Sequence, residues 1–563
     1  MRTVVHALLV GSLAACTGTV TGGAGGDGDG AKRDITPPTI VIDVPQRGTL
    51  AEGTRVVVSG RATDVESDIS QVTINGQSTS VGPDGSFSLE LEVAEGITLI
   101  ESIATDAAGN QATDARAVLA GTLVPQTTPV DDGVAAHLSG AAMDGLAGMV
   151  SDLANNTNFT AIATAANPVV DTGGGCNSAK VYVESINHAG IAVDAGPVSG
   201  GIDADVSIRR LEVRGRVSFR AVCIGGSASW TIRADAYDVG GRIAPALSGG
   251  NIAISLDGVT SAFRGFNLDV NNVPGFIENL FEGSVRDKLA DILRDKVQEM
   301  VPPMANAFLA EFLADSWSVG VLGQTVELSI RPTAMSWTSQ GGTIVLDTSA
   351  TVAGLGDALY LSSPRPRPAD ADMASTGIRI GVADDVLNQM LSAIWVSGAL
   401  EEAILPIEGD ALSAAFGADV ASATLTMMLP PVANFDTTTG TARLTVGDLM
   451  VTAVGQSGET LAEFVVSAEI ELAVETSSNG RVKLVTRTPR ILAQVLEQSP
   501  TLLTELDNLK VAAIAELAIK QMSLKADDLL ESLPVPGIAD ATITSPTFQP
   551  AGGYLLMGGE VTF

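Results

Sequence analysis

Hydrophobic and polar residues alternate most regularly in the stretch SFSLELEV, residues 86–93. On an extended chain the serine and glutamate residues fall on one side, and the other side carries Phe87, Leu89, Leu91 and Val93. An alternation of period two is typical of a strand with one buried face. The stretches VVVSGRATD, VTINGQ and ATDAAGN in the same region have a similar character, with turn residues between them. The pattern predicts a small β domain over residues 37–120.

This β domain resembles a bacterial immunoglobulin-like module, and the closing stretch DAAGN carries much of the resemblance. The resemblance implies a β-sandwich. Asp64, Glu66 and Asp68 could hold Ca²⁺ near Asp106, because hard cations take clustered carboxylates. We favour the simpler interpretation, a solvated acidic loop, and predict no metal site.

Residues 131–360 alternate between helical and strand patterns. Apolar residues at helical spacing predict a helix over 131–154, with Leu138 on its apolar side. Residues 201–223 then alternate as long two-faced strands, which a strongly curved antiparallel sheet requires. A second helix is predicted over 275–301, with Ile292 and Leu293 on its apolar face, and it should end at Pro302 and Pro303.

The stretch LSSPRPRPADAD, residues 361–372, interrupts these patterns with prolines. Proline fixes φ and removes an amide donor, so we expect an extended spacer that is neither strand nor helix. After it, residues 373–563 repeat the same order. A helix is predicted over 382–400, with Leu391 and Ile394 apolar and Gly398 as its stop. A strand over 461–475, a long helix over 500–530 that includes Leu517, and two closing strands follow.

This order of elements resembles the bactericidal/permeability-increasing and lipopolysaccharide-binding family. The residues that carry the resemblance are the helix DDVLNQMLSAIWVSGAL after the proline-rich stretch, the loop LPVPG at 533–537 and the closing stretch GYLLMGGEV at 553–561. The resemblance implies an α+β fold: two elongated, pseudo-symmetric, barrel-like halves, 131–360 and 373–563. In each half a strongly curved antiparallel sheet would wrap around long helices and bind lipid.

The N-terminus has the pattern of an export signal. Arg2 precedes an apolar stretch that ends in LAAC, and this sequence resembles the bacterial lipobox. Residues 1–15 are therefore expected to be cleaved, and Cys16 is expected to carry the lipid. Thr17 favours the outer membrane over the inner one. Residues 16–36 are rich in glycine and should form a flexible tether.

Charge and composition exclude several partners. The chain of 563 residues has 32 basic and 65 acidic side chains, a net charge of −33, so nucleic acid is not an expected partner. Beyond the N-terminus no apolar run reaches transmembrane length. No cofactor is expected.

The two remaining cysteines, Cys176 and Cys223, form an even pair in an exported protein, which predicts a disulfide. The family resemblance also implies one bond in the first half. A redox role would need a CxxC motif, which is absent.

Catalytic motifs are missing from the sequence. His137 and His188 lack metal-ligand spacing, and neither HExxH nor GxSxG occurs. We therefore expect a protein that is not an enzyme.

One stretch is basic against the overall charge. Strand alternation in RRLEVRGRVSFR places Arg210, Arg214, Arg216 and Arg220 on the outward side. They are candidates for binding anionic lipid head groups. The alternative, which we favour, is cross-strand pairing with carboxylates such as Asp203, Asp205 and Asp235.

These observations predict a lipoprotein of the cell envelope that binds or shuttles phospholipid-type acyl chains in an apolar groove between sheet and helix. The candidate groove residues are Leu138, Ile292, Leu293, Leu391, Ile394 and Leu517. The main alternative is a surface adhesin or structural lipoprotein with fully packed barrels. A defensive endotoxin binder is a third, weaker possibility, because the overall acidity argues against it.

Overall fold

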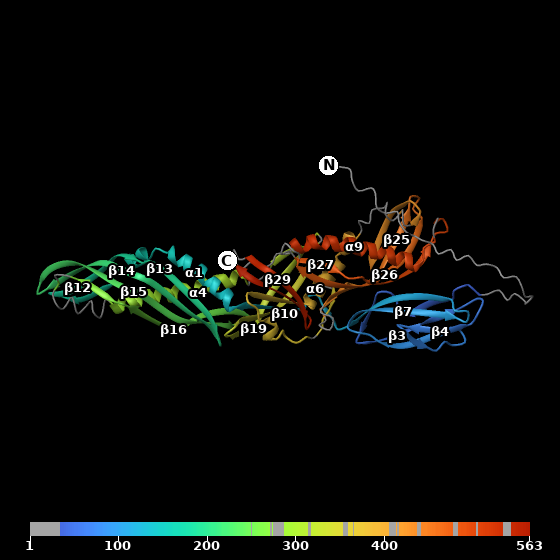
Figure 1. The fold of residues 1–563 in the computed structure, drawn as a ribbon, viewed down its shortest axis with the longest axis horizontal. Coiled ribbons are helices and arrows are strands. Elements are labelled where there is room, and N and C mark those ends of the chain that lie inside the picture. The colour runs from blue at the N-terminus through green and yellow to red at the C-terminus, as the bar shows by residue number, and fades with distance from the viewer. Residues whose placement is uncertain are drawn as a thin grey trace, which may run out of the picture.

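The computed structural model describes residues 34–563 except for 249, 271–272, 274–285, 313–316, 322, 353–357, 364, 405–412, 414–415, 436–440, 477–481, 503–504, 533–541 and 563. Cys16, the predicted export signal, most of the tether and the LPVPG stretch lie outside the described residues. The molecule is elongated and mostly β (Figure 1). None of the described helices combines the length and apolar character needed to cross a membrane.

The N-terminal domain consists of two facing sheets. One sheet is formed by β1 (Thr39–Val44), β3 (Arg55–Thr63) and β6 (Ser86–Glu92). The other is formed by β2 (Thr49–Glu52), β8 (Gln111–Gly121), β7 (Gly96–Asp106), β4 (Ile69–Ile74) and β5 (Gln77–Thr79). Phe87, Leu91 and Val93 are buried while the alternate residues are exposed, which confirms the predicted strand.

The domain does not stand apart from the rest of the chain. Leu99 and Leu119 share a buried apolar cluster with Leu361, Leu429 and Val432. A short connection, β9 (Leu123–Pro125), pairs with β21 (Leu359–Leu361). The domain therefore lies alongside the C-terminal part of the molecule (Figure 1).

The first-half sheet forms one end of the molecule and curves as a half-barrel. Its strands are β11 (Val170–Gly174), β12 (Asn177–Asn187), β13 (Gly190–Val198), β14 (Gly201–Ala221), β15 (Ile224–Ser248), β16 (Asn251–Arg264) and β17 (Asn267–Val270). Its helices are α1 (Gly140–Asn155), α2 (Phe159–Ala165) and α4 (Arg286–Phe312). The long antiparallel strands match the sequence prediction.

A central sheet joins the two predicted halves. In spatial order it contains β18 (Trp317–Val321), β19 (Gln324–Thr338), β20 (Gly341–Val352), β10 (Val130–Ser139), β22 (Ile378–Ala383), β30 (Tyr554–Thr562) and β29 (Thr542–Ala551). Strands from before and after residues 361–372 are neighbours in it, because β10 pairs with both β20 and β22. The two closing strands were predicted.

The third sheet contains β23 (Val420–Met427), β24 (Val432–Asn434), β25 (Ala442–Gly455), β26 (Thr460–Thr476), β27 (Val482–Thr486) and β28 (Arg490–Gln498). The helices near it are α5 (Asp370–Met373), α6 (Asp384–Val396), α7 (Ala399–Ile404) and α9 (Asn508–Ser532). In the described residues we do not find two barrels wrapped around helices: the helices lie against open sheets, and the balance is more strongly β than the α+β assignment implied.

Three predicted elements differ from the structure. Residues 131–139 of the first predicted helix belong to β10 instead. This strand is paired on both edges and buried on both faces, so its apolar residues do not alternate simply with polar ones. The helix predicted to stop at Pro302 instead continues to Phe312 with Pro302 and Pro303 inside it. Each proline removes one amide donor, while the neighbouring amides keep theirs. The long C-terminal helix begins at Asn508 rather than at residue 500.

The proline-rich stretch is not a free spacer. Leu361 belongs to β21 and residues 370–373 form α5, so the prediction of neither strand nor helix was wrong at both ends. Between them, Arg365 has only 7% of its side chain exposed. The segment is folded against the start of α6.

Candidate functional site

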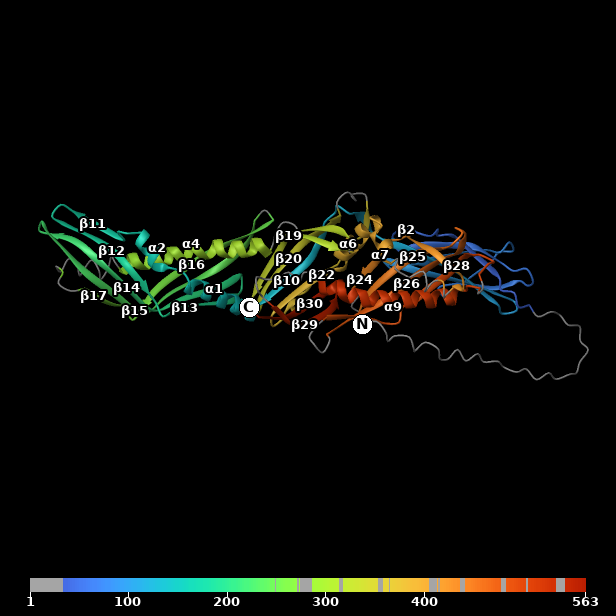
Figure 2. The same cartoon turned by 90° about the horizontal axis from the view of Figure 1, so that it is seen from above.

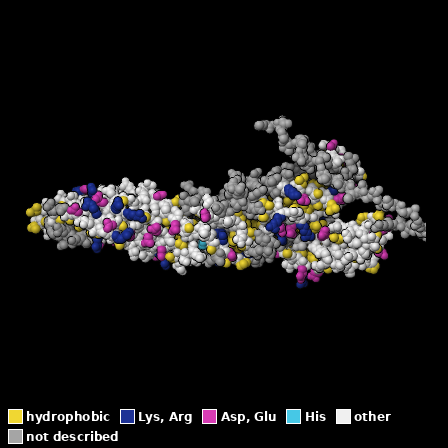
Figure 3. Space-filling model, in the orientation of Figure 1, with side chains coloured by type: hydrophobic (Ala, Val, Ile, Leu, Met, Phe, Trp, Pro, Cys, Tyr) yellow, Lys and Arg dark blue, Asp and Glu magenta, His cyan; other side chains and the backbone are white. Residues whose placement is uncertain are grey.

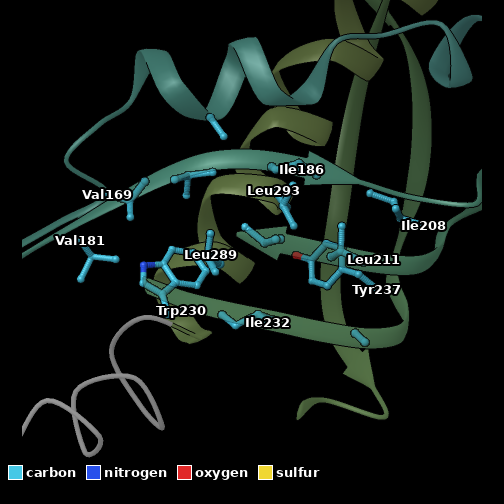
Figure 4. Close-up of a cluster of buried hydrophobic side chains, with 14 of the residues drawn as sticks. Val169, Val181, Ile186, Ile208, Leu211, Trp230, Ile232, Tyr237, Leu289 and Leu293 are labelled. Carbon is cyan, nitrogen blue, oxygen red and sulfur yellow. The ribbon is translucent and has the colours of Figure 1, made fainter. Parts of the chain in front are cut away.

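The first-half sheet is amphipathic along its whole length. Asp203, Arg242 and Asp257 lie opposite one another on the outer face of β14, β15 and β16. The opposite, inner face carries apolar residues on every strand. At the end far from the central sheet this face is well packed: Trp230, Tyr237, Leu289 and Leu293 lie close together in one buried cluster (Figure 4).

At the end next to the central sheet, the same inner face is only partly covered. Ile202 of β14 lies opposite Ile243 of β15, which in turn lies opposite Leu256 of β16, and all three are half-buried. The strand register and the alternation of side chains extend this row of apolar residues towards the β13–β14 and β15–β16 turns. We call these residues the junction wall: Ile202, Ile243, Pro245, Leu247, Ile252, Ile254 and Leu256.

Burial falls off along this face. Val239 is buried, Ile243 is half-buried, and Leu247 at the end of β15 is 37% exposed. Apolar residues on the inner face of a sheet are normally covered by packing, since each square ångström removed from water contributes about 25 cal/mol. The junction wall is therefore apolar surface that stays partly exposed.

Two helices flank the wall without filling it. α1 lies along β13 and α4 lies along β16, on opposite sides of this body (Figure 2). Hydrogen bonds fix α1 to the edge strand: Val193 N donates to Ser151 Oγ at 2.8 Å, and Ile191 N donates to Asn155 Oδ1 at 2.7 Å. On the other side the Tyr237 hydroxyl donates to the Ala290 carbonyl at 2.7 Å.

The predicted groove residues of the first half do not form one lining. Leu293 is buried in the cluster of Figure 4, and Ile292 packs half-buried against it. Leu138 lies in β10 rather than in a helix, where it packs with Ile378 and with Leu146 of α1.

The predicted groove residues of the second half are also dispersed. Ile394 is a core residue of α6, buried against β19 and β20, and Leu391 is half-buried on the same helix. Leu517 is 60% exposed on α9. Leu391, Ile394 and Leu517 therefore do not line a common groove. The predicted groove residues of the first half do not join those of the second half either.

The four predicted arginines are all exposed, as the alternation indicated. Arg214 pairs with Glu212 at 2.8 Å, and Arg216 pairs with Glu184 at 3.4 Å, so the partners are not the predicted aspartates. Among the described residues, Arg210 and Arg220 form no ion pair. Basic and acidic side chains are intermixed over this sheet (Figure 3).

Cys176 and Cys223 form the predicted disulfide, between the β11–β12 turn and the β14–β15 turn. It ties together two neighbouring hairpins at the far end of the first-half sheet.

In the acidic loop of the N-terminal domain, the carboxylates that lie close together are not the set that the sequence predicted. Carboxylate oxygens of Asp64 and Asp106 approach Asp34 within 4.8 Å, whereas Glu66 and Asp68 are exposed. Asp106 accepts from the Asn110 amide N and Nδ2, at 2.8 and 2.7 Å.

The two histidines lie apart. His137 is buried in the central sheet, with Nδ1 2.9 Å from Thr343 Oγ1, beside a small cavity of about 280 Å³ lined also by Ser336 and Gln340. His188 packs edge-on against Phe159.

A buried ion cluster marks the junction between the halves. Nη1 of Arg365 lies 3.3 Å from Asp384 Oδ1, and its Nη2 pairs with Asp385. The backbone N of Ser363 donates to Asp385, and that of Phe435 donates to Asp384 at 3.3 Å. Burial raises the pKa of Asp384 to about 6 and also raises the pKa of Asp385, while Arg365 opposes both shifts.

The rest of α6 continues this polar arrangement. Gln389 accepts from Ala350 N at 2.6 Å and donates to the carbonyl of Gln126, and Asn388 accepts from Ala433 N at 2.7 Å. The sequence suggested an apolar stripe here; the buried face instead includes several polar side chains. Gly398 ends the turn after the helix with φ of 76°, as predicted.

A second buried ion cluster fixes the N-terminal domain. Arg47 Nη1 lies 3.2 Å from Asp448 on the third sheet, and Arg116 lies 2.7 Å from Asp114. Gln494 accepts from Arg116 at 3.3 Å. Burial raises the pKa of Asp114 and of Asp448. The domain is therefore docked through buried charges and does not act as a loose spacer.

Comparisons with known proteins give limited matches. The family model of glucodextranase domain B matches residues 38–121, which agrees with an immunoglobulin-like N-terminal domain. No curated protein matches the chain.

Among solved structures, a lipopolysaccharide binding protein is 13% identical, with a TM-score of 0.44, covering 77% of this chain and 99% of its own. A structure of fibronectin(III)-like modules of Clostridium thermocellum CbhA is 24% identical over 16% of this chain and 48% of its own, with a TM-score of 0.14. P47 of Clostridium botulinum E1 is 8% identical over 77% of this chain and 100% of its own, with a TM-score of 0.24. The lipopolysaccharide binding protein structure and the family model together support a distant fold relation only.

Proposed function

We propose that this protein is a non-catalytic lipoprotein of the cell envelope that binds acyl chains of a lipid along the junction wall. In this proposal Cys16 carries the lipid anchor, and the outer membrane is the site of attachment. The immunoglobulin-like domain would brace the third sheet.

The half-burial of the junction wall is the observation that carries this proposal. A wall of seven apolar side chains on three strands, flanked by α1 and α4, offers a strip on which an alkyl chain can lie. Each buried methylene of such a chain contributes about 0.8 kcal/mol, so one acyl chain supplies enough free energy for binding without any charged contact. Charged side chains of the same strands, such as Asp203 and Arg242, lie on the other face.

The test compares two substitutions of the same residue type on the same strand. Ile243 lies in the wall and is half-buried, whereas Ile224 lies at the far end of β15 and is 74% exposed. Both are changed to aspartate in a Cys16→Ser background, so that no lipid attached to the protein itself enters the count. Organic extraction and mass spectrometry of the purified proteins then measure the bound lipid.

We expect Ile243→Asp to lower the yield of copurified lipid about tenfold or more, because a carboxylate in contact with an alkyl chain must be desolvated. Ile224→Asp should leave the yield unchanged. Near-UV circular dichroism of both variants checks that the sheet is intact. Equal yields from both variants, or no lipid from the Cys16→Ser protein, would contradict the proposal, and the second result would favour a surface protein with packed sheets.

A further inference from the structure

Trp337 lies where the junction wall meets the central sheet. Its strand, β19, crosses the ends of two hairpins of the first-half sheet. The backbone N of Gly200, in the β13–β14 turn, donates to the Trp337 carbonyl at 3.5 Å. The side chain of Arg331, six residues earlier on β19, lies beside Gly250 in the β15–β16 turn. Trp337 is therefore at the β13–β14 side of this crossing, at the turn that precedes Ile202 on β14.

Register places the indole on the face that continues the wall. Trp337 is opposite Gly342, and Gly342 is opposite Leu138, so these residues share one face of the central sheet. Leu138 packs on that face with Leu146 of α1, the helix that also flanks the wall. The indole and the wall thus lie on the same side as α1.

The orientation of the ring follows from its neighbour across the strands. A Cβ atom added to Gly342 would overlap Cζ3 and Cε3 of Trp337, so the six-membered ring covers this glycine. The pyrrole edge with Nε1 is on the opposite side of an indole. It is therefore directed away from β20, towards the free edge of β19 where the β13–β14 turn lies.

The Nε1–H group of Trp337 is buried, and no acceptor among the described residues contacts it. The indole nitrogen of Trp395, by contrast, donates to the Met427 carbonyl at 2.6 Å. Buried N–H donors are paired in nearly all folded proteins, because an unpaired one loses its hydrogen bonds to water. A donor at the end of an apolar strip suits a ligand that carries an acceptor at the end of an alkyl chain.

We propose that the Trp337 indole N–H donates to an ester carbonyl of the bound lipid and so orients it, with its polar end at the central sheet and its alkyl chain along the wall towards Tyr237. This inference rests on the proposed function and names the class of ligand: an acyl ester. A free carboxylate suits the position less well, because the wall residues carry no charge and the arginine and aspartates of these strands lie on the outer face.

The test measures two ligands of similar chain length that differ in the acceptor. Methyl palmitate and n-hexadecane compete with an apolar fluorophore for the Cys16→Ser protein and for its Trp337→Phe variant. Phenylalanine keeps an apolar ring and removes the N–H. We expect Trp337→Phe to weaken methyl palmitate about tenfold, as the loss of one hydrogen bond of about 1.4 kcal/mol would, and to leave n-hexadecane within about twofold.

Trp395→Phe is the matched control, because it removes an indole N–H that already has a protein acceptor outside the wall. It should change neither affinity. A second readout uses ¹⁵N-labelled indoles: the sequence has four tryptophans, and the cross-peak missing from Trp337→Phe should move downfield with methyl palmitate and not with n-hexadecane.

The outcomes separate this inference from the proposed function. Binding of both ligands with equal losses in Trp337→Phe would mean that the indole supplies only apolar surface, and binding of both with no loss would mean that it lies outside the site. Either result overturns the inference and leaves the proposed function standing. If neither ligand binds the unsubstituted protein, the proposed function fails and this inference fails with it.

Discussion

Arg365→Met should destabilise the junction between the halves by about 3–5 kcal/mol, the usual cost of removing one partner from a buried ion pair. The side chains of Arg365, Asp384 and Asp385 are 7%, 9% and 3% exposed. Methionine fills a similar volume but leaves two carboxylates buried without a cation. Hydrogen exchange of the α6 amides measures the effect where it should arise, as a fall in the free energy of local opening.

The same segment supplies the control. Arg367 is two residues away and pairs with Asp132 at 2.6 Å, but 52% of its side chain is exposed. Arg367→Met should cost less than about 1 kcal/mol, because water screens exposed ion pairs. Similar losses in both variants would show that the proline-rich segment is held by its backbone and not by the buried charge.

This buried arginine shows which part of the junction the sequence could predict. Alternating proline and arginine predicts an extended backbone, since proline restricts φ locally. It does not indicate what that backbone contacts. The partners, Asp384 and Asp385, stand in the sequence as ordinary first-turn acidic residues of a helix. Only the docking of α6 against β21 and the central sheet makes them buried and turns a spacer into a packed element.

The prediction for residues 131–139, the first part of the helix predicted over 131–154, was wrong for a related reason, whereas residues 140–154 are helical in α1. Val134, Leu138, Ala141 and Ala142 recur at helical spacing, but the first two belong to a strand that is covered on both faces. A strand of that kind has no polar side, so its period cannot be told from that of a helix. A glycine is needed at position 133 because a Cβ atom there would overlap Thr348 on the neighbouring strand. The sequence alone does not show that Thr348 lies opposite this glycine.

Elements with one solvent-exposed face were predicted well. The strand at 86–93, the long strands of the first half and the closing hairpin all show the alternation that the structure confirms. The junction wall has this signal too: Ile252, Ile254 and Leu256 alternate with polar or small residues. The groove residues were predicted on helices instead. That the wall is left half-covered depends on where α1 and α4 lie, and this is a tertiary feature.

Asp384→Asn should change the pH dependence of stability more than any other single carboxylate substitution at the junction. Burial raises the pKa of Asp384 to about 6, from an ordinary value of 3.8, and the neighbouring Asp385 adds to the shift. Between about pH 4 and pH 6 the folded protein therefore binds a proton that the unfolded chain releases. Stability from this group is greatest below pH 4 and falls as the pH rises through 6.

The difference between the two proteins isolates the effect. A shift of about two units at about 1.4 kcal/mol per unit means that Asp384 costs up to about 3 kcal/mol at pH 7 relative to its neutral form. Asparagine resembles that neutral form and keeps an oxygen for the Phe435 amide. The variant should therefore match or exceed the parent protein at pH 7, and the two should converge towards pH 4 in urea denaturation.

Asp238→Asn provides the comparison, because hydrogen bonding by Arg264 lowers the pKa of Asp238. A lowered pKa contributes stability that is complete above the ordinary pKa, so the loss caused by Asp238→Asn should stay constant between pH 5 and pH 7. A loss of stability in Asp384→Asn that grows towards pH 7 would contradict the argument. It would mean that Arg365 holds both carboxylates ionised, and that one guanidinium outweighs the desolvation of two buried charges.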